Sequence, residues 1–210
     1  MLDTDRFSLN DKLDVLVIHR GGCGGNFIAD LVNKYVFGVD GTTYTTEMNE
    51  YILTPSTEHK AVPMHLHLFF QDVPQDQTIV PLADLRELIN MFNQYVKKIV
   101  FVGNKIDPDW TTGLRDVKHG FEIPARRRTP INSAVSDFYQ KIYNNFLLKH
   151  YTGDLLYLEY QDFFVHGKTH TLVDFFRSSH HNDINTDVTD YHNKNVEIMK
   201  SFGWKWNKHA

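Results

Sequence analysis

The feature that most constrains this sequence is a glycine cluster between an apolar run and a segment of helical periodicity. Residues 14–18 read Asp-Val-Leu-Val-Ile, residues 21–25 read Gly-Gly-Cys-Gly-Gly, and apolar side chains recur at helical spacing over residues 26–32. A short run without interior polar residues is typical of a strand buried on both faces, as in a parallel sheet. The pattern therefore predicts a strand, a loop and a helix, which together form the first unit of an α/β fold.

The remainder of the chain continues this alternation of strands and helices. Its periodicity predicts strands over residues 61–70, 98–102 and 155–158, helices over 82–96, 133–150, 168–178 and 189–202, and irregular segments over 42–58 and 107–120. Such alternation builds a doubly wound, mostly parallel central sheet flanked by helices. Because 210 residues suffice for one ordinary core and no linker is visible, we expect a single domain over residues 1–210.

Composition excludes several classes of partner. The chain has 22 basic and 26 acidic side chains and a net charge of -4, so it lacks the basic footprint of proteins that bind nucleic acid or anionic membranes. Its single cysteine, Cys23, excludes an internal disulfide and a cysteine-based zinc site. Because no apolar run approaches the roughly 20 residues that span a bilayer, and no secretory signal is evident, we expect a soluble, cytoplasmic protein.

The glycine cluster is a candidate anion site. A glycine-rich loop before a helix exposes backbone N–H groups at the positive end of the helix dipole, although a tight turn that needs positive φ also selects glycine. The Walker A pattern is absent, because counting five residues on from Gly21 or Gly22 reaches Asn26 or Phe27 rather than Gly-Lys-Ser/Thr. Phe27 also replaces the third glycine of the dinucleotide fingerprint. An ordinary nucleoside triphosphatase or Rossmann dehydrogenase is therefore disfavoured.

A GTPase is the alternative indicated by one short motif. Residues 104–107 read Asn-Lys-Ile-Asp after a predicted strand and resemble the guanine-specificity element Asn-Lys-x-Asp of GTPases. The chain contains no Asp-x-x-Gly, and the Walker lysine that would neutralise the β- and γ-phosphates is missing. We therefore interpret this motif as a strand-end turn.

A second candidate anion element precedes the predicted helix over residues 133–150. Three arginines occupy residues 126–128, and Ser136 falls near the first turn of that helix. Guanidinium and hydroxyl donors suit a phosphate, whereas the alternative is an exposed basic patch before a helix capped by Thr129 or Asn132. The segment from Arg128 to Ser136 resembles the 3′-phosphate element of the sulfotransferases that use 3′-phosphoadenosine 5′-phosphosulfate (PAPS), which reads Arg-x-Pro-x-x-x-x-x-Ser.

Three other segments resemble motifs of the same family in the same order. Residues 21–27 resemble its 5′-phosphosulfate loop, Pro-Lys-Ser-Gly-Thr-Thr-Trp, with Gly24 on the glycine and Phe27 on the aromatic residue. Residues 62–66 resemble the strand end Lys-Thr-His-Leu, and residues 156–163 resemble the strand end Leu-x-Tyr-Glu-Asp-Leu. The resemblance spans residues 14–176 and implies the P-loop-NTPase-like architecture of the sulfotransferases.

The resemblance also implies roles for individual residues. PAPS would be the donor substrate, and the acceptor would be a hydroxyl or amine of a small molecule or glycan. The residues of the glycine loop would hold the 5′-phosphate; they are Gly22, Cys23, Gly24, Gly25, Asn26 and Phe27. Arg128 and Ser136 would hold the 3′-phosphate, and Tyr160 would pack near the adenine. His65 would be the general base, because imidazole titrates near neutral pH. Gly22 stands where the family has a lysine, and Arg20 is the candidate for that missing cation.

Other interpretations of these residues stay open. His65 and His67 alternate as polar residues would along a half-buried strand, and they could also form a metal pair, although no third ligand is indicated and sulfuryl transfer needs no metal. We expect no metal cofactor. His180 and His181 are expected in a loop. For the whole chain, the alternatives are a non-catalytic nucleotide-binding or assembly module that keeps this fold, favoured by Gly22, and a divergent nucleotide kinase.

Overall fold

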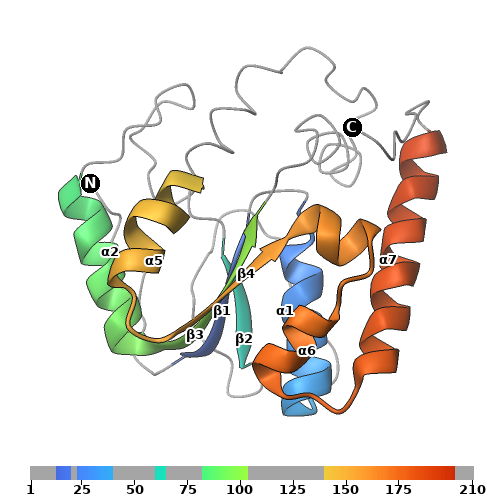
Figure 1. Cartoon of the computed structure of the whole chain (residues 1–210), viewed down its shortest axis with the longest axis horizontal. Coiled ribbons are helices and arrows are strands. Elements are labelled where there is room, and N and C mark those ends of the chain that lie inside the picture. Colours follow the sequence, from blue (N-terminus) through green and yellow to red (C-terminus); the bar gives the residue numbers. More distant parts are fainter. Residues whose placement is uncertain (1–12, 20–22, 40–59, 65–81, 104–139, 202–210) are drawn as a thin grey trace.

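A computed structural model describes residues 13–19, 23–39, 60–64, 82–103 and 140–201. Its strands form one four-stranded sheet in the order β2-β1-β3-β4, and every neighbouring pair is parallel (Figure 1). The strands are β1 (Leu13–Ile18), β2 (Ala61–Met64), β3 (Val96–Gly103) and β4 (Asp154–Glu159). The predicted α/β fold with a parallel central sheet and flanking helices is confirmed.

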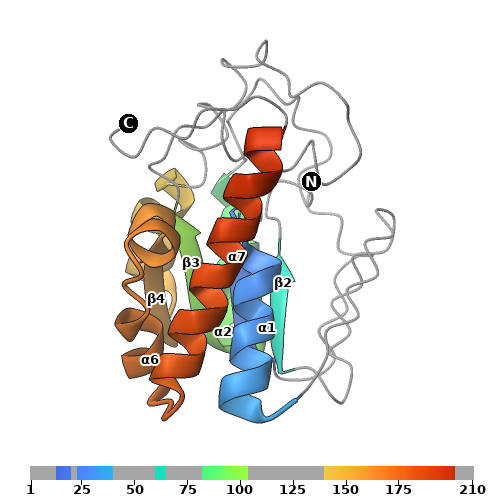
Figure 2. The same ribbon diagram turned by 90° about the vertical axis from the view of Figure 1, so that its right-hand side faces the viewer.

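Helices cover both faces of the sheet because side chains alternate along each strand. In β1, Leu16 and Ile18 pack toward one layer, whereas Val15 and Val17 pack toward the other. The first layer contains α2 (Leu82–Tyr95), the π-helical η3 (Tyr143–Leu147) and α5 (Leu148–His150). The second contains α1 (Gly25–Phe37), the π-helical η4 (Gln161–Val165), α6 (His170–Phe176) and α7 (His181–Ser201), seen in Figures 1 and 2.

The strand order places β1 at a topological switch point. The chain leaves β1 through α1 to reach β2 on one side, and β3 then pairs with β1 on the other side. Ile18 is in register with both Met64 and Phe101, so the carboxyl ends of the strands meet at one edge. The His19 backbone N–H donates to the Met64 carbonyl oxygen at 3.0 Å, which extends this alignment past β1. Open α/β sheets bind ligands at this edge.

The α7 helix begins at His181, eight residues before the predicted helix over residues 189–202, so the expected loop position is correct for His180 and wrong for His181. Most residues in the first two turns of α7 are polar, but Ile184 and Val188 bury one face at a spacing of four residues. This tertiary contact outweighs the weak helix propensity of the polar residues.

The structure also differs from the prediction at the start of β3 and directly after β4. Val96 belongs to β3 rather than to the preceding helix, because its side chain is buried against the α2 layer. The η4 segment was not predicted; it follows β4 closely and buries the consecutive side chains Phe163 and Phe164. A pair of adjacent buried aromatic residues does not match the three- to four-residue spacing that identifies an amphipathic α-helix. The predicted residues 65–70, 133–139, 42–58 and 107–120 lie outside the described part of the chain.

Candidate functional site

The α1 helix begins at the carboxyl edge of the sheet, directly after the glycine cluster. Gly24 is its N-cap, with φ 71° and ψ 19°, a left-handed conformation that favours glycine. The Ile28 N–H donates to the Gly24 carbonyl oxygen at 3.0 Å. The first turn of α1 contains no acidic residue. The positive end of this helix dipole therefore lies at the end of the central strand, uncompensated by a carboxylate of its own first turn.

Two of the glycines also permit close packing. A Cβ atom on Gly24 would lie 2.7 Å from Cζ of Phe164, and one on Gly25 would lie 2.0 Å from Cγ of His19. His19 is 3% exposed, so its ring is enclosed at the end of β1. Gly24 thus has the positive φ that a tight turn requires, and both residues are glycines because their neighbours leave no space for a side chain.

Aromatic side chains from three elements cover the start of α1. Phe27 stacks on Tyr191 of α7, with ring centroids 4.0 Å apart and planes inclined by 11°. Phe164 of η4 lies 5.4 Å from Tyr191 between ring centroids. Phe27 was a predicted site residue, whereas Tyr191 was not. The helical spacing of Tyr191 from Ile184 and Val188 could have placed it on the buried face of a helix, but not against α1.

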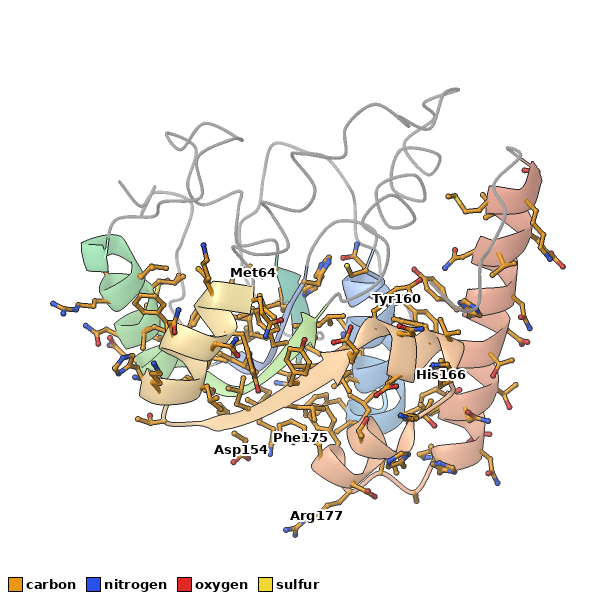
Figure 3. All side chains as sticks on the ribbon, turned by 45° about the horizontal axis from the view of Figure 1, so that its top comes forward. Met64, Asp154, Tyr160, His166, Phe175 and Arg177 are labelled. Atoms are coloured by element: carbon orange, nitrogen blue, oxygen red, sulfur yellow. The ribbon has the colours of Figure 1, made fainter. Side chains whose placement is uncertain are left out.

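The predicted residues Cys23 and Tyr160 are both core residues in this structure. Each is completely buried, and the Tyr160 ring packs against Phe164 with centroids 4.8 Å apart. Tyr160, labelled in Figure 3, directly precedes η4 as its N-cap. Tyr160 therefore packs in the core against Phe164. Its contact with adenine stays a prediction.

A polar cluster missed by the sequence analysis lies at the carboxyl ends of β3 and β4. The Tyr157 hydroxyl is 3.0 Å from Oε2 of Glu159 and 3.1 Å from Oε1 of Gln140. A Cβ atom on Gly103 would lie 2.0 Å from that hydroxyl, so the tyrosine crosses the end of β3. Burial, followed by the charge of Glu159, raises the pKa of Tyr157 and keeps the phenol protonated. The hydroxyl therefore donates its single hydrogen within this cluster, to Glu159 or to Gln140.

A cleft of about 560 Å³ lies at the opposite, amino edge of the sheet, where Figure 3 labels Asp154, Phe175 and Arg177. Lys98 is paired with Asp154, and its ammonium nitrogen lies 4.9 Å from the ring centroid of Phe175. Lys97 is likewise paired with Asp14. Both lysines are thus matched by carboxylates of the same cleft.

The structure brings the described loop residues together and leaves other predicted residues outside its range. Those brought together at the start of α1 are Cys23, Gly24, Gly25, Asn26 and Phe27. Those outside the described residues are Arg20, Gly22, His65, Arg128 and Ser136, as well as His67 and the segment 104–107. Within the described ranges, no three His, Cys, Asp or Glu side chains gather as metal ligands.

Comparison with known proteins finds no family model, curated protein or solved structure that matches this chain. In the part of the chain that the structure describes, no helix has both the length and the apolar character required to cross a bilayer.

Proposed function

We propose that this protein binds PAPS and transfers its sulfuryl group to a hydroxyl or amine of a small molecule or glycan. The observation that carries the proposal is the start of α1, where a glycine N-cap stands at the carboxyl end of the central parallel strand. Ligands of open α/β sheets bind at this edge, and helix N-termini attract phosphate and sulfate. The order of the four motifs along the chain supports PAPS over other anions.

Sulfuryl transfer requires the protein to stabilise the leaving group rather than to form a covalent intermediate. As the acceptor attacks sulfur, the bond from sulfur to the bridging oxygen breaks, and negative charge develops on the 5′-phosphate. Backbone N–H groups from Gly24 to Phe27, together with the Asn26 side chain, would stabilise that charge. His65 would take the acceptor proton, and Arg128 with Ser136 would bind the 3′-phosphate that distinguishes this donor from simpler nucleotides.

The strand order is compatible with the P-loop-like sulfotransferase architecture that we propose. β2 pairs directly with β1, and Ile18 is in register with Met64. His65, the proposed base, is the next residue in the sequence and lies outside the described part of the chain. A base that works in line with the 5′-phosphosulfate has to be held near the bound donor.

The experiment is a transfer assay with sulfur-labelled PAPS across a panel of hydroxyl and amine acceptors. His65→Ala should lower turnover by about 10²- to 10⁴-fold and leave adenosine 3′,5′-bisphosphate affinity unchanged. Arg128→Ala should weaken the bisphosphate by roughly 1.5–3 kcal/mol and barely change AMP. Equal binding of bisphosphate and AMP, unaffected by Arg128→Ala, would refute the assignment to this donor.

The second candidate is a non-catalytic module that retains nucleotide binding, and the observation in its favour is Gly22 in place of the loop lysine. Glycine has no side chain, so Gly22 cannot place a positive charge on the transferring sulfuryl group as a lysine ammonium would. This candidate predicts the Arg128→Ala effect on affinity with no transfer to any acceptor in the panel. Transfer by the wild-type protein would exclude it.

A further inference from the structure

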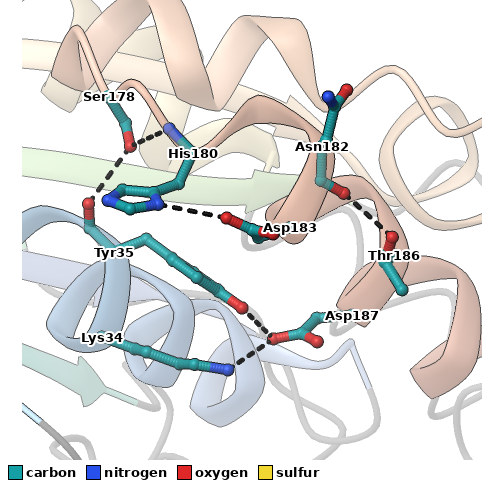
Figure 4. Close-up of polar contacts among 8 residues, drawn as sticks. All are labelled: Lys34, Tyr35, Ser178, His180, Asn182, Asp183, Thr186 and Asp187. Atoms are coloured by element: carbon teal, nitrogen blue, oxygen red, sulfur yellow. Dashed lines mark hydrogen bonds and ion pairs between the residues drawn. The ribbon is translucent and has the colours of Figure 1, made fainter.

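The α7 helix is held against α1 by a polar cluster near the amino edge of the sheet. Asp187 accepts hydrogen bonds from the Tyr35 hydroxyl at 2.7 Å and from the Lys34 ammonium at 3.0 Å (Figure 4). The Ser178 hydroxyl donates to the Tyr35 carbonyl oxygen at 3.1 Å and accepts the His180 N–H at 3.2 Å. These bonds fix the start of α7 beside the end of α1.

From that cluster α7 runs antiparallel to α1 toward the carboxyl edge, as Figure 2 shows. Asp187 contacts the last turn of α1, and Tyr191 contacts Phe27 in its first turn. A Cβ atom on Gly24 would also lie 3.4 Å from Cε1 of Tyr191. Residues of α7 beyond Tyr191 therefore reach the level at which α1 begins.

Asn195 is the next residue of α7 on this buried face. It follows Tyr191 by four residues, which in an α-helix places it about 6 Å further along the axis with nearly the same direction. It shares the face of Ile184 and Val188, and the residue is only 2% exposed. Asn195 is thus enclosed, and helix geometry puts it one turn of α7 beyond Tyr191, the residue that covers Gly24, in the direction of the carboxyl edge.

The amide nitrogen of Asn195 has no hydrogen-bond partner in the structure described here. An unsatisfied buried donor costs roughly 1–3 kcal/mol, so such groups are rare in folded proteins and commonly have a ligand, ion or water as partner. A buried asparagine within an otherwise apolar helix face is also costly compared with leucine. Because Tyr191, one turn before Asn195, covers the first turn of α1, an anion at the positive end of that helix is the kind of partner to test.

We infer that Asn195 is a ligand-binding residue whose side-chain Nδ2 donates to an oxygen of a phosphate or sulfate group held at the N-terminus of α1. A neutral amide donor suits an acceptor-only oxygen whose charge is already balanced by helix N–H groups. The inference deepens the proposed function, on which it rests only for the identity of the anion, the 5′-phosphosulfate of PAPS. It gives α7 a binding role in addition to packing.

The test compares unfolding midpoints and binding affinities of three variants. Asn195→Leu should leave the midpoint without ligand unchanged or raised, because it removes an unsatisfied buried donor, and should weaken adenosine 3′,5′-bisphosphate by about 10- to 100-fold. Asn193→Leu, on the exposed face of α7, should change neither quantity. Thr169→Val removes another buried oxygen that lacks a partner among the described residues, at the start of α6, and should raise the midpoint without changing affinity.

Asn195→Ala deletes the donor without introducing a branched side chain, and it should reproduce the affinity loss if Asn195→Leu folds poorly. Full bisphosphate affinity in either folded variant overturns the inference, as does a loss of stability without a loss of affinity. If the wild-type protein binds neither bisphosphate nor inorganic sulfate, both the inference and the proposed function fail. If it binds bisphosphate in an Asn195-dependent way and transfers no sulfuryl group, only the transferase proposal fails.

Discussion

Asn26→Asp is the substitution that best tests whether the N-terminus of α1 binds an anion or only begins a helix. Asn26 is the second residue of α1, is partly exposed, and belongs to a first turn that has no acidic residue. A carboxylate at this position interacts favourably with the helix dipole and should raise the free energy of unfolding by about 0.3–1 kcal/mol. The same charge repels any anion bound to the helix N–H groups.

The repulsion is the larger effect. Two unit charges about 5 Å apart interact by about 3 kcal/mol at an effective dielectric constant of 20, which corresponds to roughly a hundredfold in affinity. Salt screening reduces this toward tenfold at physiological ionic strength. Asn26→Asp should therefore make the protein more stable without ligand while weakening adenosine 3′,5′-bisphosphate by about 10- to 100-fold.

Urea unfolding and calorimetric titration measure the two quantities. The matched control is Asn182→Asp, since Asn182 is the second residue of α7, and the start of α7 lies beside the end of α1 rather than its first turn. It also places a carboxylate in a first helical turn and should leave bisphosphate affinity unchanged. The reasoning is refuted if Asn26→Asp binds bisphosphate as tightly as Asn182→Asp does.

Three further predictions concern stability. Arg177 has φ 54° at the end of α6, so Arg177→Gly should raise the free energy of unfolding by about 0.5–1 kcal/mol, and an unchanged denaturant midpoint would contradict this. Asn33 accepts the N–H groups of Lys60 and Ala61 at 3.0 and 2.8 Å and donates to the Ala61 carbonyl oxygen at 2.9 Å. Asn33→Ala should lower the free energy of unfolding by about 2–4 kcal/mol. The control is Asn93→Ala, because Asn93 makes exposed hydrogen bonds to the His150 carbonyl oxygen and the Thr152 N–H before β4. Equal losses of stability in the two variants would contradict the prediction. Burial raises the pKa of Tyr157, so the free energy of unfolding should fall above about pH 10, where the phenol ionises in the unfolded chain. Tyr157→Phe should make this fall with pH shallower. An unaltered slope of stability against pH would show that Tyr157 does not cause the fall.

The sequence predicts the strand–loop–helix unit well because its signals are local. The apolar run of β1 and the glycines before α1 determine backbone conformation over a few residues, and the predicted elements appear at those positions. The start of α7 was missed because its polar first turns become helical through packing of Ile184 and Val188, and the polar cluster around Asp187 reinforces that contact across more than 150 residues of sequence. Which element these residues pack against leaves no local pattern.

In the candidate site, too, some residues are predictable from the local sequence and others come together only through tertiary contacts. Gly24, Gly25, Asn26 and Phe27 are contiguous in sequence, and their assembly at one helix start follows from that contiguity. Tyr191 and Asn195 join this region only because α7 packs antiparallel to α1, and no spacing within α7 identifies its partner helix. Burial of Tyr160 behind Phe164 was equally unpredictable, since it depends on the π-helical turn after β4.

The most direct test of an anion site at the start of α1 is an NMR titration that follows backbone amide resonances with adenosine 3′,5′-bisphosphate. Hydrogen bonding to a phosphate shifts the N–H resonances that donate to it, so the resonance changes locate the bound group. We expect saturable shifts centred on Gly24, Gly25, Asn26 and Phe27, larger than those produced by an equal concentration of AMP. Saturable binding with shifts confined to other segments, or no shift at millimolar bisphosphate, would contradict it.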